Sequence, residues 1–126
     1  MKHTLRGQAL AEFALLLPMM CLLTFTMLDF GRVFYFQEAI ANAAREGARY
    51  GATTKTATSG DIIARAQNEA SGISPLNVTP VIQATGEKYV HVTVTYQFDL
   101  LTPFTEAVFG NSITLTAKSK MRAEYE

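Results

Sequence analysis

The pattern of apolar and polar positions changes along the chain. The first part is an almost continuous apolar run. The run extends from Ala9 to Leu28, and its main interruptions are Glu12 and Pro18. A helix of about 20 apolar residues is long enough to cross the roughly 30 Å hydrocarbon core of a bilayer. The pattern therefore predicts one membrane-spanning helix near the N-terminus.

Beyond Asp29 the apolar positions recur at three- and four-residue steps, which is typical of a helix with one buried face. No proline interrupts this part, and Gly51 with the threonine-rich stretch after it indicates the end. We predict one helix from about Gln8 to Tyr50, half in the membrane and half beyond it. Pro18 removes one backbone hydrogen bond, so we expect a kink there. The recurring positions are Val33, Phe36, Ile40, Ala43, Ala44 and Gly47.

Small residues are frequent in the outer half of this helix, and they let another backbone approach closely. The pattern predicts packing of this half within the protein, but it does not distinguish a sheet from another helix as the partner. These residues are Ala39, Ala41, Ala43, Ala44, Gly47 and Ala48.

The rest of the chain predicts a short helix followed by strands. Ser59 or Gly60 is expected to precede the helix, Asp61 lies in its first turn and Gly72 is expected to end it.

Strict alternation of apolar and polar residues predicts three strands. The clearest runs from Val90 to Phe98, and another places Ile113, Leu115, Ala117 and Met121 on one face. The stretch 77–84 is the weakest strand, because Pro80 suits the edge of a sheet. Residues 85–88 predict a hairpin turn, and residues 100–110 predict a long connection with one helical turn.

A three-stranded antiparallel sheet with one apolar face needs a cover, and the outer half of the long helix can supply it. The predicted fold class is therefore α+β. A long N-terminal transmembrane helix continues into a small head, which holds a short helix and the three-stranded sheet.

Charge and composition exclude several functions. Lysine plus arginine and aspartate plus glutamate each number 11, so no broad basic surface is available for nucleic acid. The single cysteine, Cys21, cannot form an intrachain disulfide, and we interpret it as a small apolar residue. His3 and His91 are too isolated for a metal site, and no phosphate-binding, dinucleotide or nucleophile motif occurs. We expect no enzymatic activity, cofactor, metal or small-molecule substrate.

The N-terminal run differs from an ordinary secretory signal. Signal peptides usually have an apolar core of about 7–15 residues followed by a small-x-small cleavage site. Here the run is longer, and no convincing Ala-x-Ala site follows it. Lys2 and Arg6 precede the run, so the N-terminus is expected in the cytoplasm and the head outside it.

Glu12 is a carboxylate just inside the apolar run, and two interpretations remain open. It can snorkel to the headgroups, because it lies near the end of the run. Alternatively, a cut between Gly7 and Gln8 would create an α-amine at Gln8, with a pKa of about 8 in water. That amine could pair with Glu12 of a neighbouring subunit and offset the cost of its burial.

These residues also carry a family resemblance. Gly7, the four residues from Gln8 to Ala11, and then Glu12-Phe13 match the pattern of type IV prepilin processing sites. The stretch "RGQALAEFALLLP" resembles the start of TadE-like pilus assembly proteins, which are pseudopilins of the tight-adherence pilus system. The later "DFGR" and "ANAAREGARYGA" resemble the next segments of that family, so the resemblance covers residues 6–51.

The resemblance implies a pilin-like, non-catalytic protein of the bacterial inner membrane. Residues 1–7 would be a leader removed by a prepilin peptidase, residues 8–28 the transmembrane half of the helix, residues 29–51 its extracytoplasmic half and residues 52–126 the head. Glu12 and Phe13 would set helix register against other pilins or pseudopilins. The alternative is an unprocessed single-span protein whose outer domain binds an envelope partner or a ligand.

Overall fold

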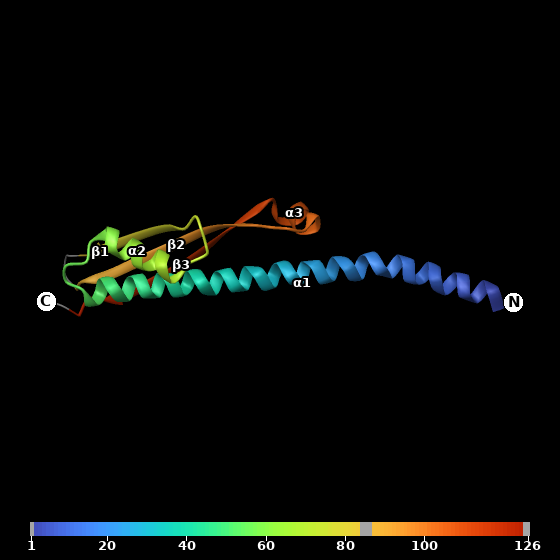
Figure 1. Cartoon of the computed structure of the whole chain (residues 1–126), viewed down its shortest axis with the longest axis horizontal. Helices are drawn as coiled ribbons and strands as arrows, with labels where there is room; N and C mark the ends of the chain where they lie inside the picture. Colours follow the sequence, from blue (N-terminus) through green and yellow to red (C-terminus); the bar gives the residue numbers. More distant parts are fainter. Residues whose placement is uncertain (1, 84–86, 125–126) are drawn as a thin grey trace.

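The structure consists of one long helix and a small head packed along its second half (Figure 1). The computed structural model describes residues 2–83 and 87–124, with side chains from Gly7 onward. In chain order the elements are α1 (Lys2–Thr53), α2 (Ser59–Glu69), β1 (Asn77–Gln83), β2 (Tyr89–Asp99), α3 (Pro103–Phe109) and β3 (Ser112–Arg122). The predicted α+β fold, with a long apolar helix, a short helix and three antiparallel strands, is confirmed.

Helix α1 is longer than the predicted Gln8–Tyr50 at both ends. It is continuous through Gly7 and Pro18, and the kink at Pro18 stays a prediction. It also passes Gly51, which was expected to end it. A Cβ atom at Gly51 would lie 2.7 Å from Ile62 Cδ1 and 2.9 Å from Val90 Cγ1. Tertiary packing of this backbone therefore outweighs the weak helix propensity of glycine.

The sheet has the order β1-β2-β3, and both neighbouring pairs are antiparallel. Strand β1 lies at an edge and contains Pro80, as predicted from the missing backbone donor of proline. The expected hairpin turn at residues 85–88 lies partly outside the described residues. The strands that flank it are paired through Gln83 and Tyr89.

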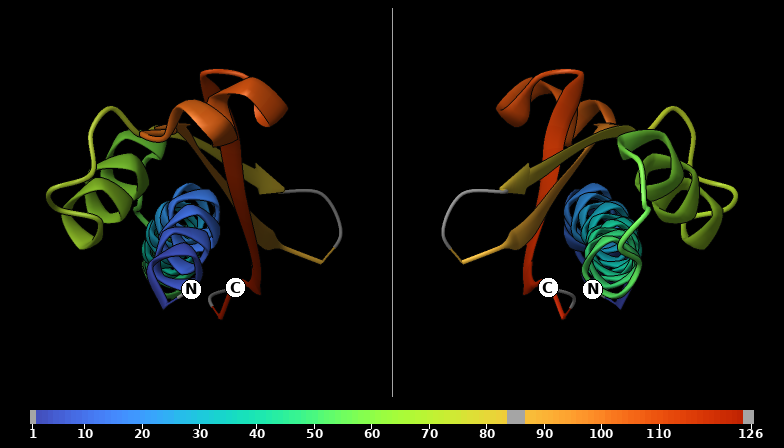
Figure 2. Two further views of the ribbon diagram at one scale, coloured as in Figure 1. Left: turned by 90° about the vertical axis from the view of Figure 1, so that its right-hand side faces the viewer. Right: turned by 90° about the vertical axis from the view of Figure 1, so that its left-hand side faces the viewer.

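The core lies between the second half of α1 and one face of the sheet. Val90, Val92, Val94 and Phe98 of β2 are buried, and Ile40 of α1 has no exposed surface. Figure 2 shows α1 end-on, with the sheet on one side and α2 on another. The small residues therefore face two partners at once, which the sequence left open.

Two helix termini differ from their predictions. The N-cap of α2 is Thr58, rather than Ser59 or Gly60. Its hydroxyl accepts from the backbone N–H of Asp61, whose carboxylate accepts from the Thr58 N–H at 2.9 Å, a reciprocal capping box. At the other end, α2 stops at Glu69, and Gly72 adopts its positive φ of 97° in the turn that follows.

The connection between β2 and β3 contains more helix than the expected single turn. Helix α3 has 7 residues and begins with Pro103, whose missing N–H costs nothing at a helix start. Gly110 follows it with a φ of 83°, a conformation that glycine adopts without strain. This connection places a small apolar helix at the end of the head nearest the first half of α1 (Figure 1).

Candidate functional site: the exposed half of α1 and its junction with the head

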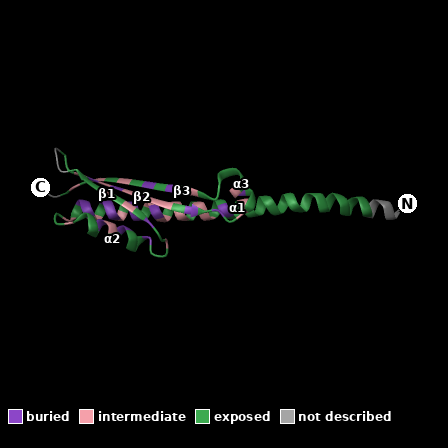
Figure 3. Ribbon diagram, turned by 90° about the horizontal axis from the view of Figure 1, so that it is seen from above, coloured by how far each residue is buried: buried purple, intermediate pink, exposed green. Residues whose placement is uncertain are grey.

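The first half of α1 exposes large apolar side chains on all its faces. Figure 3 shows this half in the colour of exposed residues, whereas buried residues gather in the head. Leu15 and Met27 are both 79% exposed. An exposed apolar surface of this size is unfavourable in water. By length and composition α1 is a candidate membrane span.

The polar groups inside this apolar half are satisfied by the helix itself. The hydroxyls of Thr24 and Thr26 donate to the backbone oxygens of Met20 and Leu22, at 2.9 and 2.8 Å. Such bonds remove the need for water, which the hydrocarbon core does not provide. Both threonines are therefore compatible with an apolar surrounding.

Gln8 and Glu12 lie on the same face of α1, one turn apart. The side-chain amide of Gln8 donates to Oε1 of Glu12 at 3.1 Å, and both residues are exposed. Their four-residue spacing brings them together on the helix. The neighbouring Phe13 is 58% exposed. The helix passes from Gly7 to Gln8 without a break, and a Cβ at Gly7 would meet nothing within 4 Å.

At the end of the apolar run, Asp29 joins α1 to the connection that leads into α3. Its side chain is 4% exposed. Oδ2 accepts from the backbone N–H and hydroxyl of Thr102, at 3.2 and 2.6 Å, and from the hydroxyl of Thr105 at 2.8 Å. Arg32 lies 3.4 Å from the other oxygen. The carboxylate thus fixes the position of α3 on the long helix.

The same contacts set the ionisation of Asp29. Burial acts to raise its pKa, but the hydrogen bonds from Thr102 and Thr105 outweigh burial, and the pKa is lowered overall. Asp29 is therefore charged at neutral pH. Sequence reasoning treated it only as a flank of the apolar run. Its partners lie 73 and 76 residues away, so no local signal could have revealed them.

Towards the far end of the head, Glu46 joins α1 to α2. Its carboxylate accepts from Arg49 at 2.8 Å and from Arg65 at 2.9 Å. These two hydrogen-bonded guanidinium groups lower the pKa of Glu46 to about 2. The Arg65 contact joins α1 to α2 across the head.

The described residues show no arrangement suited to metal binding. Among them, no group of three or more His, Cys, Asp or Glu side chains converges on one point. His91 pairs across the sheet with Val81 and Lys120 and lies at the partly exposed, polar face of β2. Cys21 is a free, exposed thiol on the apolar half of α1.

Fold and surface together define a class of protein: a small α+β head carried on a long helix, whose first half is a candidate membrane span. The family model of TadE-like proteins matches residues 7–49, which confirms the resemblance inferred from the sequence. The matched segment begins at Gly7 and contains Gln8, Glu12 and Asp29. It covers the exposed half of α1 and most of the buried half, and the sheet lies outside it. No match was found among curated proteins or among solved structures.

Proposed function

We propose that this protein is a non-catalytic pseudopilin, or minor pilin, that takes part in assembly of a tight-adherence type IV pilus. The observation that carries the proposal is the exposed apolar half of α1 within the segment that matches TadE-like proteins. A helix of this kind can be stored in lipid and then packed against other helices, because both surroundings are apolar.

Maturation would begin with removal of residues 1–7 by a prepilin peptidase, which cuts after Gly7. Residues 8–28 would then lie in the bacterial inner membrane, with residues 29–51 and the head, residues 52–126, outside the cytoplasm. The helix is exposed around Gly7, so a membrane protease meets no tertiary contact there, although it must open the helix locally. Other pilins or pseudopilins would then bind through the N-terminal helix.

Glu12 and Gln8 would set the register between neighbouring subunits. In the uncut chain the Gln8 side chain is the hydrogen-bond donor to Glu12. Cleavage adds a positively charged α-amine at the same residue, and the carboxylate then attracts this group on a neighbour. Pairing lowers the cost of a carboxylate in an apolar bundle, and Phe13 beside it would pack between helices.

The test is the intact mass and N-terminal sequence of the protein from its native membranes. The proposal expects a chain that starts at Gln8, and it expects Gly7→Val to leave the chain uncut. A chain that starts at Met1 would overturn maturation and favour an unprocessed single-span protein that binds an envelope partner or ligand.

The register role of Glu12 has a separate test. Glu12→Ala should leave membrane insertion intact but lower incorporation into assemblies by about tenfold, which corresponds to about 1.4 kcal/mol. Glu12→Gln is the matched control for charge, because it keeps the size of the side chain and should also assemble poorly. Normal assembly of both variants would remove the pairing from the proposal.

A further inference from the structure

Helix α3 and the residues before it form an apolar tip at the end of the head nearest the candidate span. We propose that this tip enters the interfacial region of the outer leaflet, so that the head rests on lipid. The proposal depends on the proposed membrane span, and its partner is the phospholipid bilayer. The tip is defined by four side chains: Leu101, Phe104, Val108 and Phe109.

The tip is unusually apolar for the surface of a head domain. Its four defining side chains are between 48% and 68% exposed. Within residues 100–110 the only charged residue is Glu106, which is half-buried. Clustered large apolar groups on a surface mark a site that another apolar phase covers.

The position of the tip along α1 matches the depth of the bilayer interface. A span from Ala9 to Leu28 fills about 30 Å of hydrocarbon at roughly 1.5 Å per residue. The headgroup layer adds about 5–7 Å, or roughly four residues, on each side. That layer would extend to about Val33. The residues of α1 that border the tip run from Phe25 to Val33, so the tip lies at the edge of the hydrocarbon and in the headgroup layer. Asp29 binds Thr102 and Thr105, and a cavity of about 80 Å³ separates Phe30 and Val33 of α1 from Phe109.

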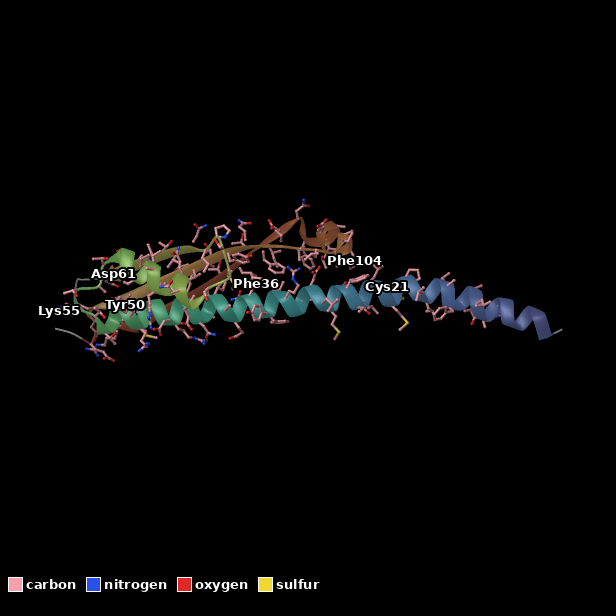
Figure 4. All side chains as sticks on the ribbon, viewed as in Figure 1. Cys21, Phe36, Tyr50, Lys55, Asp61 and Phe104 are labelled. Atoms are coloured by element: carbon pink, nitrogen blue, oxygen red, sulfur yellow. The ribbon has the colours of Figure 1, made fainter. Side chains whose placement is uncertain are left out.

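The direction of the side chains agrees with this depth. In Figure 4, Phe104 lies at the end of the head that faces Cys21 and the apolar half of α1. On α1 itself, aromatic side chains remain exposed at the same level and just beyond it, namely Phe30, Phe34 and Tyr35. Aromatic side chains favour the membrane–water boundary, where an apolar ring meets a polar layer.

A groove between the tip and α1 has the chemistry of a phospholipid. It has a volume of about 360 Å³ and apolar walls that include Phe25, Leu28 and Leu101. Arg32 also lines it, with 40% of its side chain exposed. The apolar walls suit an acyl chain, and the guanidinium suits a lipid phosphate. Asp29 also lines the groove: its Oδ2 accepts the threonine hydrogen bonds, and Arg32 lies 3.4 Å from its Oδ1, so Arg32 would meet a lipid phosphate while it is paired with Asp29.

A tryptophan scan tests the depth of the tip, because the chain contains no tryptophan. Phe104→Trp in the full chain is placed in phosphatidylcholine vesicles whose acyl chains are brominated at different depths. We expect the largest loss of emission with bromines near the headgroup and a smaller loss with bromines near the chain end. Leu16→Trp in the span is the positive control, and Val81→Trp on β1 is the matched control for an exposed apolar position far from the tip.

The controls separate failure of the tip from failure of the span. If Leu16→Trp is quenched but Phe104→Trp behaves like Val81→Trp, the tip lies outside lipid and the inference is wrong. If Leu16→Trp is unquenched as well, both the proposed span and the inference are wrong. If the emission of Phe104→Trp changes with protein density but not with brominated lipid, the partner is a second copy of the protein. That result would also overturn the inference. Phe109→Trp repeats the test if Phe104→Trp does not fold.

Discussion

The two halves of α1 have the same backbone conformation but opposite surroundings. In the first half, large apolar residues are exposed around the whole helix, and Leu16 is 53% exposed. In the second half, the apolar residues form a stripe, and Ile40, Ala44 and Ala48 have no exposed surface. The comparison shows that composition around the helix, rather than helicity, distinguishes the exposed half, which is a candidate membrane span, from the half that builds the head.

The junction between the halves is a chemical boundary as well as a geometric one. Asp29 is the first charged residue after Glu12, and it binds Thr102 and Thr105 of the head. The second half of α1 is joined to the sheet through the core, because Ile40 and its neighbours are part of it.

The largest expected contrast between the halves comes from truncating one apolar side chain in each. Ile40→Ala should lower the free energy of unfolding of the head by about 2–5 kcal/mol, because it leaves a cavity in the core. Leu16→Ala should leave that free energy unchanged, because Leu16 contacts no part of the head. The measurement is hydrogen exchange of the β2 amides, with the full chain in detergent micelles. Equal effects from both variants would mean that the first half also supports the head.

A smaller contrast comes from adding one methyl group at a glycine in α1. Gly51→Ala should destabilise the head by about 1–3 kcal/mol, because the new Cβ overlaps Ile62 and Val90. Gly31→Ala is the matched control, since a Cβ there meets nothing within 4 Å. It should be neutral or stabilising by up to about 1 kcal/mol, from better helix propensity. Hydrogen exchange of the β2 amides measures the stability of the head in both variants. An unchanged stability in Gly51→Ala would show that the Ile62 side chain moves aside freely.

Much of the fold follows from local patterns in the sequence. Alternation located β2, Pro80 located an edge strand, and the helical stripe identified the cover of the sheet. The continuation of α1 past Gly51 was not predictable, because it depends on contacts with Ile62 and Val90 that lie elsewhere in the chain. The cap at Thr58 was missed because several neighbouring residues can cap a helix, and only the backbone conformation selects one.

The candidate site, too, contains contacts that follow from the sequence and contacts that do not. Gln8 and Glu12 share a face because their spacing is one helical turn, so this contact could have been derived from the sequence. Their part in cleavage and register stays a prediction. The link between Asp29 and Thr105 could not be inferred, since it requires knowing how the β2–β3 connection returns to α1.

The smallest expected effect concerns Glu46, which holds α2 against the buried half of α1. Its pKa is lowered from 4.5 to about 2 in the folded protein, so the unfolded chain binds the proton more tightly. The stabilisation is therefore complete above about pH 4.5 and is lost as the pH falls towards 2. Glu46→Gln should cost about 1 kcal/mol at neutral pH and flatten this part of the pH profile.

Glu38→Gln is the control for Glu46→Gln, because it removes the same charge from an exposed position of α1. Thermal unfolding of the head between pH 2 and 7 measures both variants. Asp61 also contributes to the loss of stability in acid, since hydrogen bonds from Thr58 lower its pKa. This contribution has the same sign in both variants. The comparison should therefore isolate Glu46 as the difference between the two profiles. Parallel profiles would show that the Arg49 and Arg65 contacts are solvated in solution and add nothing to the packing of α2 on α1.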